Sequence, residues 1–187
     1  MSNMLYLVYV VLGVGIALVV VRVVKVARTY FELRGKRLVT CPETKAPAAV
    51  DLDAARAAEQ SAWGKPHLRL SECSRWPERQ SCGQECLSQI EAAPEGCLVR
   101  NIVSKWYAGK ACAYCDKPIE GIDWLGGQRP ALADADRKTL QWDQIRPEQL
   151  PELLSKCAPV CWNCYITETF RREHPELVVE RPWRKVG

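Results

Sequence analysis

Cys112-Ala113-Tyr114-Cys115 and Cys161-Trp162-Asn163-Cys164 are the two C-x2-C pairs that decide how the C-terminal half of the chain folds. A single tight turn lets both sulfur atoms of such a pair bind one ion, and four thiolates at the corners of a tetrahedron form the standard closed zinc site of small folds. The second pair also opens a predicted helix that ends near His174, and a helix N-terminus favours thiolate over thiol. The sequence therefore predicts one zinc site with Cys112, Cys115, Cys161 and Cys164 as its ligands.

The residues after the first pair, Asp116 to Ile119, lead into an apparent hairpin. This order of a cysteine knuckle, a hairpin and a C-x2-C pair at a helix start resembles the treble-clef and zinc-ribbon class of four-cysteine zinc fingers, over residues 110–174. The two pairs are 45 residues apart, whereas about 15 to 20 is typical, so the resemblance implies a finger with a long insertion. Cys157 stands four residues before Cys161 and is expected to be a free buried thiol, with a ligand role as the alternative.

A second group of cysteines lies earlier in the chain. Cys73, Cys82, Cys86 and Cys97 follow a C-x8-C-x3-C-x10-C spacing, and Cys41 is available as an alternative ligand. This spacing matches no common zinc signature, but the i, i+4 pair Cys82 and Cys86 can face one point. We expect a possible second zinc site here. An iron–sulfur cluster uses the same thiolates and is the less favoured alternative, because the compact cysteine run of ferredoxins is missing.

The N-terminal segment has the pattern of a transmembrane helix. Residues 1–21 carry no charge, and only Gly13 and Gly15 interrupt the aliphatic run from Leu5 to Val21. Residues 4–26 are long enough to cross a hydrocarbon core of about 30 Å. A cleaved signal peptide is the less favoured alternative, because the basic n-region and a small-x-small cleavage site are missing. We assign residues 1–27 to the membrane helix.

Basic residues set the expected orientation of this helix. None precedes it, whereas six follow it within residues 22–37: Arg22, Lys25, Arg28, Arg34, Lys36 and Arg37. The positive-inside rule therefore places the C-terminal part in the cytoplasm, with residues 28–37 as a basic juxtamembrane segment. Thiols in that reducing compartment bind metal more often than they form disulfides.

Composition narrows the class of the remaining chain. The chain has ten Cys and seven Trp, and of its 26 basic and 22 acidic residues, 20 and 21 follow residue 37. A nearly neutral soluble part lacks the basic surface that nucleic-acid binding requires. A small fold that is rich in cysteine and poor in aliphatic residues needs additional cross-links to be stable, and we expect bound metal to supply them here. We predict an α+β fold of two small metal-stabilised modules, residues 38–108 and 109–187.

Local patterns predict the elements of these modules. In the first module we expect a hairpin from 38–41 and 48–52, helices over 53–62, 83–92 and 97–107, and a strand at 68–70. In the second module we expect strands in 119–125 and 130–142, the latter with a turn at 134–137, and a helix over 147–156.

No catalytic constellation is visible. The two histidines, His67 and His174, stand beside no hydrolase motif, and no Gly-rich phosphate loop is present. We therefore expect a non-enzymatic module that docks to another protein, with Trp124, Trp142, Trp162 and Trp183 as candidate interface anchors. The alternatives are a thiol oxidoreductase, an iron–sulfur electron carrier, and a metal sensor or delivery protein.

Overall fold

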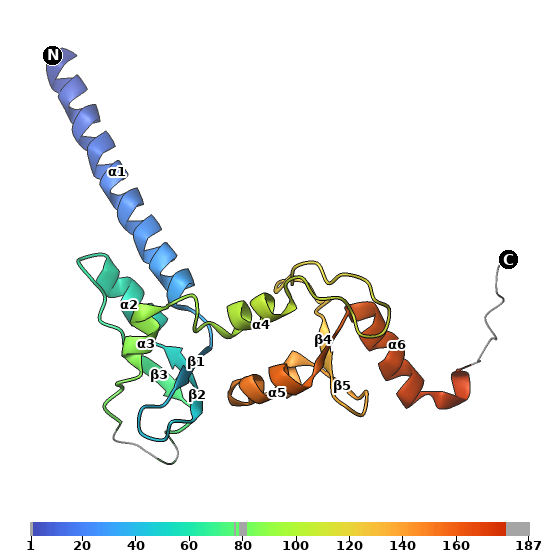
Figure 1. Ribbon diagram of the computed structural model, residues 1–187. Coiled ribbons are helices and arrows are strands. Elements are labelled where there is room, and N and C mark those ends of the chain that lie inside the picture. The colour runs from blue at the N-terminus through green and yellow to red at the C-terminus, as the bar shows by residue number, and fades with distance from the viewer. Residues whose placement is uncertain (1, 77, 79–81, 179–187) are drawn as a thin grey trace. The chain divides into compact units, whose positions relative to one another are not determined.

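The computed structural model describes residues 2–76, 78 and 82–178, which excludes Trp183. In these ranges the chain forms α-helices and two three-stranded antiparallel sheets (Figure 1), so the expected mixture of helix and sheet is confirmed. The chain divides into two compact units, Met1–Val99 and Arg100–Gly187. This division falls at the start of helix α4 (Val99–Tyr107), whereas the predicted module boundary lies just after its end.

Helix α1 (Ser2–Leu33) is the long apolar element of the first unit. Residues Met4–Leu33 are long and apolar enough to cross a membrane, and none of their most apolar window is buried. The helix continues six residues beyond the predicted end at residue 27, so much of the basic juxtamembrane segment is helical. Arg28 and Glu32 support this extension with an i, i+4 ion pair of 2.6 Å.

Arg37 closes the C-terminal end of α1. Its side chain is fully buried, and its guanidinium donates to the carbonyl oxygens of Glu32 at 2.9 Å, Leu33 at 2.5 Å and Gly35 at 3.1 Å. Such terminal carbonyls have no partner within a helix, and a cation there also complements the helix dipole. Arg37 is also the first residue of the strand that follows, so it connects α1 rigidly to that strand.

The first sheet has the order β1-β2-β3, formed by β1 (Arg37–Thr40), β2 (Pro47–Leu52) and β3 (Leu70–Cys73). The predicted hairpin and the helix that follows it, α2 (Ala54–Ser61), are confirmed, and Asp53 caps α2 by accepting from Arg56 N. The third strand begins two residues later than predicted. Helix α3 (Leu87–Ala92) packs Ile90 against Val39, Val50 and Leu70 of the sheet.

Helix α2 lies along the C-terminal half of α1 (Figure 1). Side chains of both helices, among them Val26 and Tyr30 of α1 and Ala58 of α2, line a shallow apolar groove. Trp63 follows α2 and is 82% exposed, with the Arg22 guanidinium 4.6 Å from its ring centre.

The second unit contains a sheet of order β5-β4-β6, from β4 (Ala131–Ala133), β5 (Thr139–Leu140) and β6 (Ala158–Val160). Its helices are α4, α5 (Leu150–Lys156) and α6 (Trp162–Glu173), with 3-10 turns at Trp142–Gln144, Pro147–Gln149 and Pro175–Leu177. The predicted turn at 134–137 is confirmed, since Asp134 N donates to Lys138 O across it.

The strands of the second unit differ from the prediction in two places. The strand expected over 119–125 is wrong, because Asp123 accepts the backbone N–H of Leu125 at 2.9 Å and folds the segment into a turn. Strand β6 was not predicted: it has three residues with Pro159 in the middle, and neither length nor alternation marks it.

Three tryptophans of the second unit make hydrogen bonds within it. The indole N–H groups of Trp106, Trp124 and Trp142 donate to Leu154 O, Ser104 Oγ and Pro130 O at 2.8–3.0 Å. Each of these rings is half-buried. Trp124 and Trp142 are thus held by hydrogen bonds within their own unit, and their role as interface anchors stays a prediction.

Candidate metal centre

The first C-x2-C pair lies in a tight turn held by two backbone hydrogen bonds. Cys112 N donates to Lys117 O and Asp116 N donates to Cys112 O, each at 2.9 Å. Asp116 takes the left-handed conformation at φ 59°, which the turn requires and which Asp tolerates better than most residues. The result is a knuckle, residues 112–117, that presents the sulfurs of Cys112 and Cys115 on one side.

The second pair is positioned by the passage from β6 to α6. Cys161 is the N-cap residue of α6 and Cys164 is the third residue of the helix. Ala113 N donates to Pro159 O at 2.8 Å, so the knuckle is hydrogen-bonded to β6. This contact brings together two cysteine pairs that are 45 residues apart in sequence.

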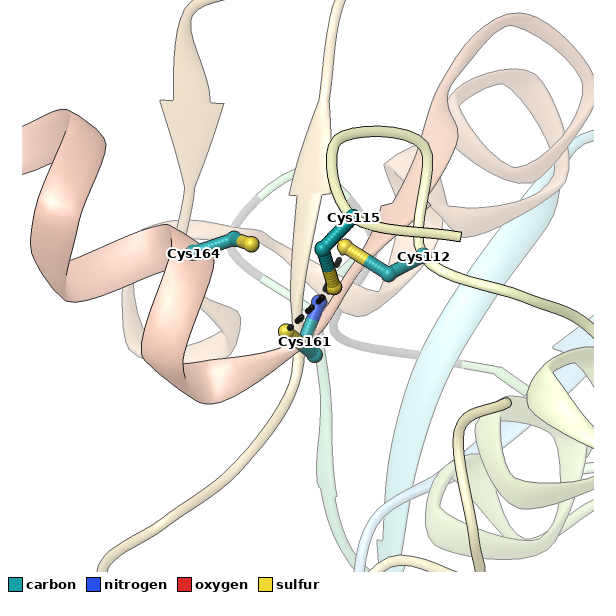
Figure 2. A group of neighbouring side chains, drawn as sticks. All are labelled: Cys112, Cys115, Cys161 and Cys164. Carbon is teal, nitrogen blue, oxygen red and sulfur yellow. Dashed lines mark hydrogen bonds between the residues drawn. The ribbon is translucent and has the colours of Figure 1, made fainter. Parts of the chain in front are cut away.

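All four sulfur atoms lie within 4.8 Å of one another (Figure 2). The Sγ atoms of Cys115 and Cys161 are 3.7 Å apart, far from the roughly 2.05 Å of a disulfide. Zn–S bonds of about 2.3 Å give a tetrahedron with S···S edges of about 3.8 Å. The four cysteines are therefore positioned to bind one metal ion, as the sequence predicted.

Backbone donors stabilise negative charge at this site. Burial raises the pKa of Cys112, but N–H groups of Cys161, Tyr114 and Cys115 outweigh it and lower the pKa to about 7. The Cys161 N–H lies 3.3 Å from the Cys112 sulfur (Figure 2). Burial raises the pKa of Cys161 and of Cys164, where the neighbouring thiols add to the effect. A bound cation would offset the cost of ionising these neighbouring buried thiols.

The surroundings of the four sulfurs are largely apolar. Cys112 is 2% exposed and packs with Ala133 and Val160 of the sheet, while Ile119 and Tyr165 lie against this cluster. Cys115 is the exposed member of the set. Four protein ligands leave no open coordination position, which is typical of structural rather than catalytic metal sites.

The remaining cysteines lie elsewhere, and all ten are free. Cys41, Cys73, Cys82 and Cys86 line one cavity of the first unit. Cys97 is separate from that cavity: its sulfur is 3.7 Å from Gln89 O. Cys157 is half-buried, and burial raises its pKa. Among the residues that the structure describes, no other group of three potential ligands converges as closely as the set at the knuckle.

No protein-family model matches the chain, and no significant match was found among curated proteins or among solved structures. The resemblance to treble-clef and zinc-ribbon fingers therefore remains at the level of the motif and the local geometry. Function has to be argued from the site itself.

Proposed function

We propose that this chain is a membrane-anchored zinc protein whose C-terminal unit is held together by a structural four-thiolate site and serves as a non-enzymatic interaction or assembly module. The observation that carries the proposal is the set of four sulfurs within 4.8 Å, with one S···S distance of 3.7 Å. Tetrahedral coordination by four thiolates is the preferred environment of zinc.

A single ion fits the sulfur geometry better than an iron–sulfur cluster does. The four sulfurs surround one point, whereas a cluster interposes several irons and sulfides between its cysteines. A single tetrahedral iron would fit the same ligands, so the metal must be identified by measurement. Zinc also suits a structural site because it has no redox chemistry.

Anchoring by α1 is supported by its length and its exposure. Its 32 residues span about 48 Å at 1.5 Å per residue, and none of its most apolar window is buried. A bilayer would cover this window. The basic residues that follow the apolar run place the two folded units on the cytoplasmic side in this proposal.

The interaction role is supported by apolar side chains on α6. Ile166 and Phe170 are one helical turn apart and are 45% and 47% exposed, and Phe170 contacts the His174 ring at 5.0 Å between centres. Because the metal ligands Cys161 and Cys164 fix the first turn of α6, this apolar stripe would be held in place for a protein partner. Phe170→Asp should abolish cross-linking of the full-length protein to a protein partner in its membrane without loss of metal, and persistence of the cross-link would count against the stripe.

The deciding experiment is the metal content of full-length protein purified in detergent micelles. Colourless protein that loses one equivalent of zinc per chain in Cys112→Ser supports the proposal, and Cys157→Ser serves as the matched control. Brown protein with iron and sulfide would move the assignment to electron transfer. Metal-free protein would overturn the proposal.

The remaining alternatives are separated by two further assays. Thiol oxidoreductase activity predicts reduction of insulin disulfides, which a closed zinc site does not support. A metal sensor or delivery protein predicts rapid exchange of bound zinc with a chelator, whereas a structural site exchanges slowly. A C-terminal tag that proteases reach from outside intact cells would refute the proposed orientation.

A further inference from the structure

Four cysteines of the first unit surround one cavity. Cys41, Cys73, Cys82 and Cys86 line a cavity of about 100 Å³, together with apolar side chains that include Val39, Val50 and Leu70. These cysteines come from three separate segments of the chain, and none belongs to the site at the knuckle 112–117. Four thiols gathered among aliphatic side chains are a ligand set of the type that soft metal ions select.

Strand register explains why Cys41 and Cys73 meet. Val39 pairs with Ala48 and Val50 pairs with Cys73 across the sheet β1-β2-β3. Side chains alternate between the faces of a strand, so Cys41, two residues after Val39, projects from the same face as Val39. Ala48, Val50 and Cys73 share that face as well. The sheet therefore directs both sulfurs towards the side on which α3 packs.

Gln84 positions the other two cysteines. Its side-chain oxygen accepts the N–H of Leu70 in β3 at 3.0 Å, which fastens the Cys82–Cys86 segment to that strand. Gln84 has φ 57°, and its own N–H points to the Cys82 sulfur at 3.4 Å. Cys86 follows in the next turn and is buried at 6% exposure, in contact with the sheet.

The turn after Cys41 repeats the geometry of the metal-site knuckle. Cys41 N donates to Ala46 O and Lys45 N donates to Cys41 O, each at 2.9 Å. These bonds match those made by Cys112, at the same offsets and the same length. Lys45 has φ 56°, as Asp116 has φ 59°.

The two knuckles differ at one important position. Thr44 stands where the second knuckle has Cys115, so the first knuckle contributes one sulfur and not two. Cys73, Cys82 and Cys86 supply the three sulfurs that a four-thiolate set then requires. Backbone and side-chain hydrogen bonds from Thr44 lower the pKa of Cys41.

We propose that Cys41, Cys73, Cys82 and Cys86 form a second metal-thiolate site, with Zn²⁺ as its ion and Cys97 outside it. Cys97 was predicted as a ligand from its spacing, but it faces Gln89 O and does not line the cavity. A bound ion would draw the four sulfurs inward from the cavity walls to separations of about 3.8 Å. The inference is independent of the proposed function, which uses the other four cysteines.

The test is a count of zinc per chain in full-length protein purified from zinc-supplemented cells. Wild type and Cys97→Ser are expected to hold two ions, and Cys82→Ser and Cys112→Ser one ion each. One ion in wild type that Cys112→Ser loses and Cys82→Ser keeps would overturn this inference and leave the proposed function standing. One ion with the reverse pattern would support this inference and overturn the C-terminal site.

A second measurement uses wild type alone, in case the variants fail to fold. Thiol alkylation of the native protein, followed residue by residue with mass spectrometry, reports which cysteines are ligands. Cys41, Cys73, Cys82 and Cys86 should react at least about tenfold more slowly with zinc bound than after chelation, because bound thiolates are poor nucleophiles. Equal rates in both conditions at these four residues would overturn the proposal.

Discussion

Helix α6 is expected to depend on the metal for its attachment to the second unit. None of its 12 residues is buried. Its hydrogen bonds to the sheet are the 3.5 Å contact between the hydroxyls of Thr169 and Thr139 and the 3.1 Å bond from Arg172 to Thr139 Oγ1. An isolated helix of this length is marginally stable in water. Removal of one ligand, by Cys164→Ser, should therefore release α6.

The size of the effect follows from the contributions that hold α6 in place. A structural zinc contributes about 10 kcal/mol or more, while two neutral hydrogen bonds add about 1 kcal/mol each. An equal quarter of the metal's contribution is about 2.5 kcal/mol, so loss of one ligand weakens the attachment by at least that amount, and by more where the ion leaves altogether. The lower bound corresponds to roughly 60-fold more frequent opening.

Hydrogen exchange measured by mass spectrometry on full-length protein tests this expectation. Amides of α6 should exchange at least roughly 60-fold faster in Cys164→Ser, since local opening sets the exchange rate. Cys157→Ser is the matched control, because Cys157 lies outside the sulfur cluster. Exchange of α6 at the wild-type rate after loss of the metal would refute the reasoning.

Three further perturbations have defined outcomes. Because the folded, metal-free protein lowers the pKa of Cys112 to about 7 from an ordinary 9, this thiolate contributes stability that is complete above pH 9 and is lost as the pH falls through 7, and protons compete with the metal for it chiefly below pH 7; the apparent zinc affinity, measured by chelator competition from pH 9 to 5, should therefore fall more steeply below pH 7 than above it, and a slope that stays unchanged through pH 7 would contradict this expectation. Tyr107→Phe leaves the buried Ala131 carbonyl without the hydroxyl that donates to it at 2.6 Å, so unfolding should become easier by about 1–3 kcal/mol; an unchanged denaturant midpoint would count against this bond. Arg37→Leu removes three donors from the end of α1 and should destabilise the first unit by about 2 kcal/mol or more, while Arg34→Leu, at an exposed position, should have little effect on the same denaturant midpoint.

The parts of the fold that were predicted from sequence depend on local signals. Helix α6 was found because Cys161, the apolar stripe and Pro175 mark its start, face and end. The C-terminal sulfur cluster was found because each C-x2-C pair can bind an ion through its own turn. Neither result requires knowledge of contacts between distant residues.

The parts that were missed depend on long-range contacts. Nothing in the spacing distinguishes Cys41 from Cys97, and only the pairing of Val39 with Ala48 and of Val50 with Cys73 shows which sulfurs share a face. Strand β6 exists because β4 pairs with it, not because Ala158–Val160 favours a strand. The first knuckle left no usable signal in the sequence, because C-P-E-T-K and C-A-Y-C-D share only their first residue.

Under the proposed anchoring of α1 in a bilayer, the contacts made by Arg37 determine how rigidly the first unit is attached to the membrane helix. The guanidinium of Arg37 binds the last carbonyl oxygens of α1, and its backbone begins β1. The first sheet is therefore attached rigidly to the helix and not through a flexible linker. The part of α1 beyond residue 21 is roughly 18 Å long, and α2 packs beside it. If α1 spans a bilayer as proposed, a partner that docks on this unit would meet it at a fixed distance from the membrane surface.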